Sequence, residues 1–177
     1  IAYRAADVER IHRAGKIVAV IGIENGFVIG TDLSLLPLYH KLGARYITLA
    51  HGGHNDIADS ATPRENLGDA TAEHDGVSPF GGRVIASMNR LGIMVDVSHI
   101  SKDAVLDAVR LSRAPVIASH SNARALADHP RNLDDETLRA LADRGGVLQT
   151  VALGAYVKAG ASAGTPATVA DFVDHID

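Results

Sequence analysis

The chain has 177 residues, 46% of them hydrophobic, so it can bury one sizeable core and is too short for two ordinary domains. Its formal net charge of −4 and the lack of a Lys/Arg run interleaved with aromatic residues argue against a nucleic-acid partner. It contains no cysteine, so a transition metal would have to be held by His, Asp or Glu.

No segment of the sequence predicts membrane insertion. The longest apolar run, residues 17–23, is far shorter than the ~20 residues that span a bilayer, and no targeting segment opens the chain. We therefore expect no transmembrane segment in these residues. The first residue is Ile1 rather than Met, so any signal peptide would lie upstream, and cytoplasmic, periplasmic and secreted locations all stay open.

Short β-branched apolar runs alternate with longer segments whose apolar residues recur every three or four positions. This alternation predicts strand-helix-strand units, and hence an α/β fold with a parallel sheet. The runs are nearly continuous in apolar residues, as expected for strands that are covered on both faces. Five strands are predicted, at residues 17–23, 46–50, 93–97, 115–119 and 147–151.

Four helices are predicted between these strands, and a fifth begins at Val169. Ser101 and Asp134 are placed to cap two of them, because their side chains can accept from unpaired amides in the first helical turn. Gly43, Gly92 and Gly145 fit left-handed caps at the other ends. The apolar faces comprise Leu33, Leu36, Tyr39 and Leu42; Val84, Met88 and Leu91; Val105, Ala108 and Val109; and Leu138, Leu141 and Ala142.

One segment breaks this rhythm. Residues 52–78 are rich in Asp, Gly, Asn, Thr and Glu and show little periodicity. A loop of this length in a compact domain is usually functional or mobile.

Polar side chains stand at the carboxyl ends of the first four predicted strands. Glu24, His51, His99 and His120 end successive strands, and the carboxyl edge of a parallel sheet is where ligands and catalysis are found. Each residue alone could be a solvated loop carboxylate or a hydrogen-bonded histidine. Four in register favour a metal site, because neutral imidazoles and a carboxylate suit Zn²⁺ or another borderline divalent ion.

The other histidines are expected to lie away from this site. The pattern places His12 and His40 in helices, His74 and His129 in polar loops, and His175 in the terminal helix, all at the surface. His54 follows His51 by three residues in a loop without helical geometry, so we expect it at the rim rather than among the ligands.

Arg131 allows two interpretations. It follows the fourth strand and precedes a predicted helix start, which places it on the same rim as the histidines. It could pair at the surface with Asp134 or Asp135, which contributes little to stability. Alternatively its planar donor fork could bind a substrate carboxylate at two points.

Several strings of the sequence resemble the renal (membrane) dipeptidase family of zinc metallopeptidases. The likeness extends over nearly the whole chain and includes Arg131-Asn132 and residues 171–176. The strings are residues 22–26 (GIENG), 42–51 (LGARYITLAH), 76–81 (GVSPFG), 89–99 (NRLGIMVDVSH) and 114–121 (APVIASHS).

The resemblance implies part of a (β/α)8 TIM-type barrel with two zinc ions per full-length subunit, which hydrolyses dipeptides; other divalent metals and a homodimer stay open. Glu24 matches the carboxylate that bridges the metals, and His99 and His120 match the imidazoles of the second metal. His51 matches the histidine that stabilises the scissile carbonyl, and Arg131 matches the arginine that binds the substrate carboxylate.

The resemblance also implies residues that the sequence does not contain. These are a His-x-Asp pair for the first metal, on a first barrel strand, and an acid on a last one; the His-x-Asp strings at residues 54–56 and 175–177 lie in the long loop and in the terminal helix instead. We therefore expect residues 1–177 to be an incomplete segment of a single barrel domain, without its first and last strands and inactive when expressed alone. Residues 60–75 have no counterpart in the mammalian form, which leaves the side-chain preference of the pocket open.

Two alternative functions stay open at this point. A binuclear metal site on such a barrel could hydrolyse other amides, lactones or N-acyl amino acids. Without the missing ligands, the chain could also be an inactive, truncated or metal-binding remnant.

Overall fold

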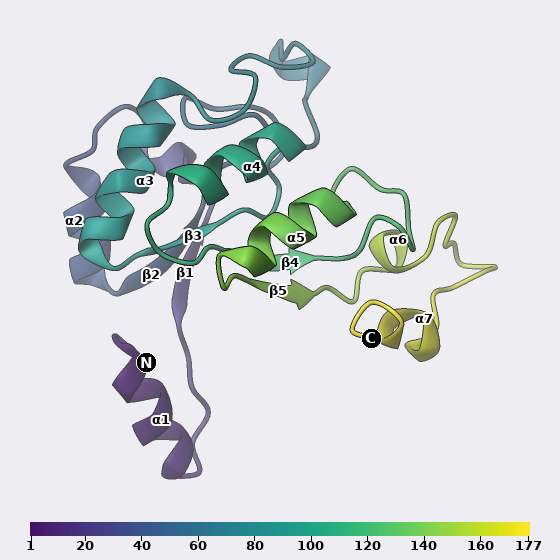
Figure 1. Ribbon diagram of the computed structural model, residues 1–177, viewed down its shortest axis with the longest axis horizontal. Coiled ribbons are helices and arrows are strands. Elements are labelled where there is room, and N and C mark those ends of the chain that lie inside the picture. The colour runs from purple at the N-terminus through teal and green to yellow at the C-terminus, as the bar shows by residue number, and fades with distance from the viewer.

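The computed structural model describes all 177 residues, and its centre is a five-stranded parallel sheet (Figure 1). The strands follow one another across the sheet in chain order, β1-β2-β3-β4-β5, and the sheet is open at both edges. A parallel sheet in sequence order is the arrangement of a (β/α)8 barrel, so the predicted α/β class and the partial barrel are confirmed. The strands are β1 (Ile21–Glu24), β2 (Ala44–Thr48), β3 (Met94–Asp96), β4 (Ile117–Ser121) and β5 (Val147–Thr150).

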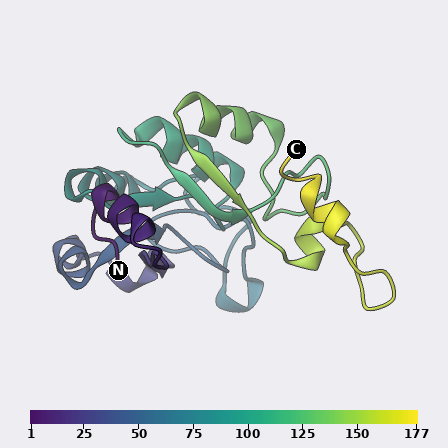
Figure 2. The ribbon, with the colours of Figure 1, turned by 90° about the horizontal axis from the view of Figure 1, so that it is seen from below.

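Four helices connect the strands and pack against one another in chain order. Helix α2 (Leu35–Leu42) contacts α3 (Pro79–Leu91), α3 contacts α4 (Lys102–Leu111), and α4 contacts α5 (Asp135–Asp143). Figure 2 shows α4 and α5 along one side of the strands. Each helix thus returns the chain so that the next strand ends at the same edge of the sheet.

Other helices lie at the ends of the chain and in the loops. Helix α1 (Ala5–Arg13) has no buried residue and projects away from the sheet (Figure 1). The remaining elements are the 3-10 helices η1 (Gly26–Ile29) and η2 (Glu65–Leu67) and the helices α6 (Gly154–Val157) and α7 (Val169–Val173). None of the helices is both long enough and apolar enough to cross a membrane.

The hydrophobic core lies between the sheet and the helices. Ile47 and Val95, which pair in register across β2 and β3, join Ile85, Met88 and Val105 of the helices in one buried cluster. Burying a side chain of this size contributes about 1.5–3 kcal/mol relative to leaving it exposed. The core therefore holds the central strands firmly, and with them the residues at their carboxyl ends.

All five predicted strands exist, but their first and last residues and their burial differ from the prediction. Strand β1 begins at Ile21, and Ile17 is 94% exposed, so the apolar run from residue 17 was wrongly assigned to the strand. Strand β4 continues to Ser121, which places His120 inside the strand rather than after it. Strands β1 and β5 are partly exposed because each has a neighbour on one side only. The central strands are more deeply buried, although Met94 of β3 is exposed and β2 and β4 contain half-buried residues.

The predicted caps at Gly43, Gly92, Ser101 and Asp134 are confirmed, whereas Gly145 follows the α5 cap residue Arg144. Gly43 and Gly92 have φ of 112° and 75°, a left-handed conformation that costs glycine little. The Ser101 side chain accepts from the Ala104 amide, and Asp134 accepts from the Thr137 amide.

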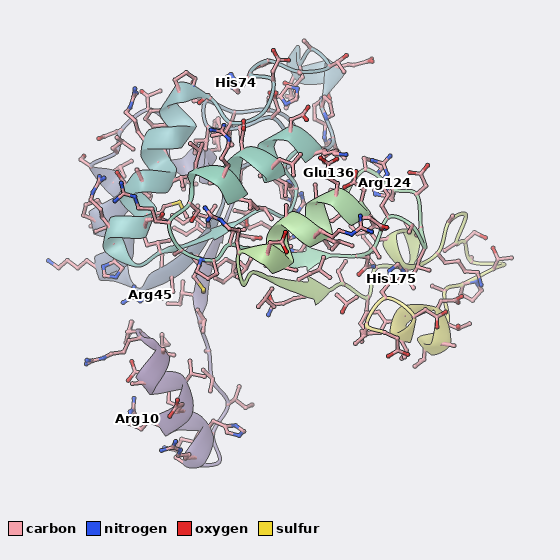
Figure 3. All side chains as sticks on the ribbon, in the orientation of Figure 1. Arg10, Arg45, His74, Arg124, Glu136 and His175 are labelled. Atoms are coloured by element: carbon pink, nitrogen blue, oxygen red, sulfur yellow. The ribbon has the colours of Figure 1, made fainter.

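The long loop 52–78 is held in place by a buried carboxylate. Asp59 is 1% exposed and accepts hydrogen bonds from the backbone amides of Glu73, His74 and Gly76. Burial is the largest single effect and raises the pKa of Asp59, but these bonds together outweigh it, so the pKa is lowered. The loop is also joined to the end of β3 by a 2.7 Å bond from the Ala61 amide to the His99 carbonyl. In Figure 3, His74 marks this loop at the top of the molecule.

Candidate metal centre

The structure brings four predicted residues together at the carboxyl edge of the sheet. Glu24 is the last residue of β1, His51 and His99 follow β2 and β3, and His120 lies near the end of β4. All three imidazoles face one oxygen, Glu24 Oε1: the His99 Nε2 atom lies 3.0 Å from it, His120 Nε2 3.1 Å and His51 Nε2 3.5 Å. Three nitrogen donors and a carboxylate oxygen thus converge on a single point.

The imidazole rings are packed against one another. The Nε2 atoms of His99 and His120 are 2.7 Å apart, and the ring of His51 stacks on that of His99 with centroids 4.0 Å apart. The donor atoms of Glu24, His51 and His99 all lie within 4.8 Å of one another. This spacing suits atoms that share a cation, since each Zn–N bond is about 2.0–2.1 Å long.

The environment keeps the two inner histidines neutral. Burial, followed by the positive charges of Arg131, His51 and His120, lowers the pKa of His99 to about 2. Burial and Arg131 also lower the pKa of His120, against the opposing pull of Asp96 and Glu24. A neutral imidazole offers a lone pair, which is the form that binds a metal ion.

Two residues of this edge adopt a backbone conformation that L-amino acids rarely take. His99 has φ of 73° and Asn25, next to Glu24, has φ of 98°. Such residues cost of order 1–3 kcal/mol and persist only when their surroundings fix them. The Asn25 side chain bonds to the Phe27 amide and to Asn55, so neighbouring contacts hold this turn. Strain concentrated beside Glu24 and His99 is typical of a functional site.

Arg131 lies inside the protein, so the surface-pair interpretation is wrong. It is 3% exposed, whereas Asp134 pairs with Lys102 and Asp135 with Arg139. Burial lowers the pKa of the guanidinium, which forms no salt bridge. Its Nη2 donates to the His120 carbonyl at 3.3 Å, and its Nε has no partner. A buried cation with a free donor is poised for an anionic ligand.

Tyr156 completes the surroundings of Arg131, and the sequence analysis missed it. It belongs to α6, which follows β5, and the Arg131 Cζ lies 5.5 Å from the centre of its ring. The His129 ring packs against Tyr156, with ring centroids 4.4 Å apart. Tyr156 follows the fifth predicted strand, on the rim that carries the histidines, and this position could have identified it as a candidate.

The remaining histidines stay outside the cluster, although not all are at the surface. His12 is exposed, and His40, His74 and His129 are half-buried. His54 is a buried loop anchor: its Nδ1 accepts from the Ser60 amide, and its Nε2 bonds to the Ala70 carbonyl.

The surface assignment of His175 was wrong. This residue, labelled in Figure 3, is 8% exposed and lies just after α7 rather than in it. It bonds to the Val157 carbonyl and the Ala123 amide, and so ties the end of the chain to the sheet.

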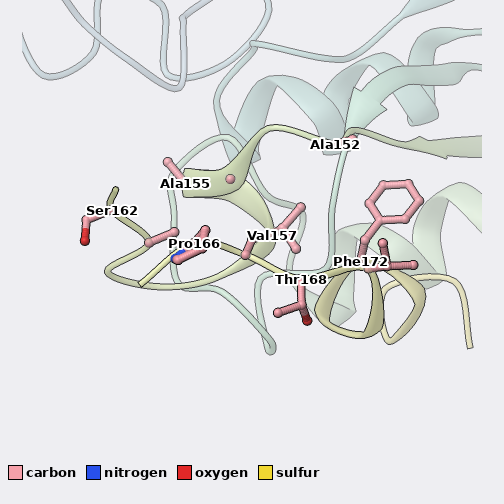
Figure 4. Close-up of a pocket in the computed structure, with 11 residues that line it drawn as sticks. Ala152, Ala155, Val157, Ser162, Pro166, Thr168 and Phe172 are labelled. Carbon is pink, nitrogen blue, oxygen red and sulfur yellow. The ribbon is translucent and has the colours of Figure 1, made fainter. Parts of the chain in front are cut away.

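The largest cavity lies apart from the cluster. It has a volume of about 500 Å³ and is lined mainly by apolar side chains of α6, α7 and the segment between them, including Val157, Pro166 and Phe172 (Figure 4). None of the converging residues lines it. The histidine cluster and this cavity are therefore separate sites.

Comparisons with known proteins identify the family and the fold of this chain. A family model described as membrane dipeptidase (peptidase family M19) matches residues 1–177. Dipeptidase tcpJ of Claviceps purpurea is 43% identical over 147 residues, which are 83% of this chain and 33% of that protein. The crystal structure of the probable dipeptidase PvdM from Pseudomonas aeruginosa superposes with a TM-score of 0.86 at 38% identity, over 89% of this chain and 40% of that one.

A second solved structure carries a ligand. It is a metallo peptidase from Rhodobacter sphaeroides with a phosphinate mimic of the dipeptide L-Ala-D-Ala, and it superposes with a TM-score of 0.87 at 28% identity. The similarity covers 99% of this chain and 50% of that one. Against the curated relatives, the chain spans between 33% and 38% of their length.

Proposed function

Because the chain belongs to the membrane dipeptidase family, peptidase family M19, we propose that the protein is a zinc-dependent dipeptidase whose metal centre includes Glu24, His99 and His120. One observation carries the proposal: the Nε2 atoms of both histidines lie within 3.1 Å of the same carboxylate oxygen and 2.7 Å from each other. Relatives named as dipeptidases, and a neighbour that binds a dipeptide mimic, support the substrate class.

The donor set fits zinc. Imidazole nitrogen and carboxylate oxygen are ligands that Zn²⁺ accepts, and the lowered pKa of His99 keeps its nitrogen available. A carboxylate has two oxygens, so Glu24 can bridge two ions, as the family resemblance suggests. The two His-x-Asp strings of the chain, residues 54–56 and 175–177, lie outside the cluster, and the family resemblance suggests the second ion for His99 and His120.

Zinc held by Glu24, His99 and His120 would supply Lewis acidity, which lowers the pKa of a bound water and polarises a carbonyl. The chain's own residues then position the substrate. The His51 side chain is 44% exposed beside Glu24, so its imidazole can reach a bound substrate and donate to the oxygen that gains charge as the carbonyl is attacked.

We assign to Arg131 the binding of the carboxylate at the end of the substrate. Its buried guanidinium has a free Nε and no acidic partner, so a carboxylate would supply the missing acceptor and counter-charge. The ring of Tyr156 lies against the guanidinium and restricts its movement. Recognition of a free carboxylate near the scissile bond selects short peptides rather than proteins.

The test compares substrates on the intact protein. The zinc-loaded protein should hydrolyse unprotected L-Ala-L-Ala, and removal of the metal by a chelator should abolish the release of alanine. N-acetyl-alanine and a γ-lactone should be turned over poorly. Preference for either of these would favour another amidohydrolase function, and no turnover of any of them would favour a remnant without catalysis.

A further inference from the structure

A buried carboxylate lies directly beneath the candidate metal centre and takes no part in the proposed function. Asp96 is the last residue of β3 and is 0% exposed. Its Oδ1 accepts from the amides of Ser98 at 3.0 Å and Ser119 at 2.9 Å. Its Oδ2 accepts from the hydroxyls of Thr48 and Ser119, both at 2.6 Å. Asp96 thus accepts four hydrogen bonds but pairs with no Lys or Arg, although burying an unpaired charge is costly.

These contacts fix the state of the carboxylate. Backbone amides can only donate, so both acceptor positions of Oδ1 are taken. The two contacts at Oδ2 have the length of hydroxyl bonds to an ionised oxygen, which is about 2.5–2.7 Å. Asp96 therefore acts as an acceptor only, and the hydroxyl proton of Ser119 points toward it.

The direction of this bond determines where His120 carries its proton. The Ser119 Oγ also lies 2.7 Å from His120 Nδ1. Its only proton goes to Asp96, so it must accept from His120, which places the imidazole proton on Nδ1. The His120 Nε2 lone pair is then free and faces Glu24 Oε1 at 3.1 Å. A metal ion could bind both of these acceptor atoms.

Asp96 also joins the strand ends that carry two proposed ligands. It binds the Ser98 amide, one residue before His99, and the Ser119 amide, one residue before His120. The link is reinforced because the His120 amide donates to the Ser98 Oγ at 3.0 Å.

We propose that Asp96 is a positioning residue of the metal centre: through Ser119 it holds His120 in the tautomer whose Nε2 can bind a metal ion. The inference rests on the proposed metal centre for its purpose, but the hydrogen-bond chain itself can be tested without metal. Carboxylates that orient a ligating histidine in this way typically change metal affinity by about 10- to 100-fold when they are lost.

The isosteric substitution Asp96→Asn should reverse the direction of the hydrogen bonds that run from Asp96 through Ser119 to His120. The asparagine oxygen would accept from the two backbone amides, and its NH₂ group would face the two hydroxyls as a donor. The Ser119 hydroxyl would then donate to His120 Nδ1, which moves the imidazole proton to Nε2 and blocks the metal-binding lone pair. A second variant, Ser119→Ala, removes the relay but keeps the carboxylate and the packing, and so serves if Asp96→Asn does not fold.

The experiment uses intact, isotope-labelled protein with two measurements. Two-bond ¹H–¹⁵N correlation spectra of the metal-free protein report the tautomer of His120, and competition with a chromophoric chelator reports zinc affinity. Wild-type His120 should carry its proton on Nδ1, Asp96→Asn on Nε2, and Ser119→Ala should show no fixed preference. Zinc affinity should fall by about 10- to 100-fold in Asp96→Asn and by roughly tenfold in Ser119→Ala.

The matched control is Asp59→Asn, which alters another buried carboxylate, one that is bonded to the loop 52–78 and to none of the proposed ligands. It should change neither measurement. The proposal is overturned if His120 keeps its proton on Nδ1 in both test variants, or if both bind zinc as tightly as wild type. If wild-type protein binds no zinc, the metal centre fails, and the tautomer alone still decides the role of Asp96.

Discussion

Replacing Arg131 with Met should separate the cost of burying a charge from its use in binding. The guanidinium is 3% exposed and forms no salt bridge, and its Nε has no partner, an arrangement that costs about 1–3 kcal/mol. Its one hydrogen bond, to the His120 carbonyl at 3.3 Å, contributes about 0.5–1.5 kcal/mol. Methionine has a similar reach and can pack on Tyr156, so the free energy of unfolding should rise or stay within about 1 kcal/mol of wild type.

The same substitution should damage catalysis. Loss of a charge-assisted bond to the substrate carboxylate costs about 1.5–3 kcal/mol, which is roughly a ten- to hundredfold fall in kcat/KM. The assay measures kcat/KM for a dipeptide and for its amide, which lacks the carboxylate. Wild-type protein should strongly prefer the free acid, and Arg131→Met should lose this preference. Arg131→Lys should lose most of it as well, since lysine keeps the charge but not the two-point fork.

Arg139→Met is the control for these effects. Arg139 is exposed and pairs with Asp135 on α5, so its loss should change neither the substrate preference nor the stability appreciably. The reasoning is refuted if Arg131→Met lowers the free energy of unfolding by more than about 3 kcal/mol and leaves the acid-to-amide ratio unchanged, because Arg131 would then be a structural residue.

Changing His99 or His120 to Ala removes one of the few proposed zinc ligands, so zinc content by elemental analysis and activity should fall together; normal zinc stoichiometry in either variant would count against the assignment. In metal-free protein the pKa of His99 is about 2 in the folded state, below its value in the unfolded state. The contribution of neutral His99 to the free energy of unfolding is therefore present above about pH 6.5 and is lost as the pH falls. Denaturant titrations should show that the free energy of unfolding of wild type falls between about pH 7 and pH 5.5 by about 1 kcal/mol more than that of His99→Gln. An equal fall in both proteins would contradict this. In α3, a Cβ at Gly81 would overlap the backbone carbonyl of Ile57, so Gly81→Ala should cost about 1–3 kcal/mol of stability. Gly82→Ala is the matched control, since its Cβ would meet only a Leu111 methyl at 4.0 Å, and an equal loss in both variants would show that the clash is not the cause.

The strand order and the converging residues could be predicted because both depend on local pattern. Apolar runs ending in Glu24, His51, His99 and His120 identify strands and the residues at their carboxyl ends, and parallel strands bring those ends to one edge. The limits of β1 could not be predicted in this way. Ile17 is as apolar as Ile21, and only the pairing with β2, which begins at Ala44, decides which of them belongs to the sheet.

Buried polar residues were missed or misjudged for a different reason. His175 was assigned to the surface and Asp96 was not singled out, because a sequence pattern shows polarity but not the partners that satisfy it. His175 is buried because a carbonyl and an amide from other segments meet its two nitrogens. Asp96 is buried because two amides and two hydroxyls from neighbouring strands converge on it. Such sites become visible only when the strands are assembled.

Arg131 shows how burial decides between two interpretations that the sequence left equal. The nearby Asp134 and Asp135 were possible surface partners, but Asp134 forms a salt bridge with Lys102 at 2.7 Å and Asp135 forms one with Arg139. The structure turns Arg131 inward toward His120 and Tyr156 instead. A charged residue is rarely buried without a partner, so its position favours a role in binding over one in stability.

The most direct test of the metal centre is anomalous diffraction at the zinc edge from crystals of the intact, zinc-loaded protein. We predict a peak about 2.0–2.2 Å from a carboxylate oxygen of Glu24 and from the Nε2 atoms of His99 and His120. An ordered histidine cluster with no anomalous peak, or a zinc ion bound only elsewhere in the protein, would contradict the proposed function.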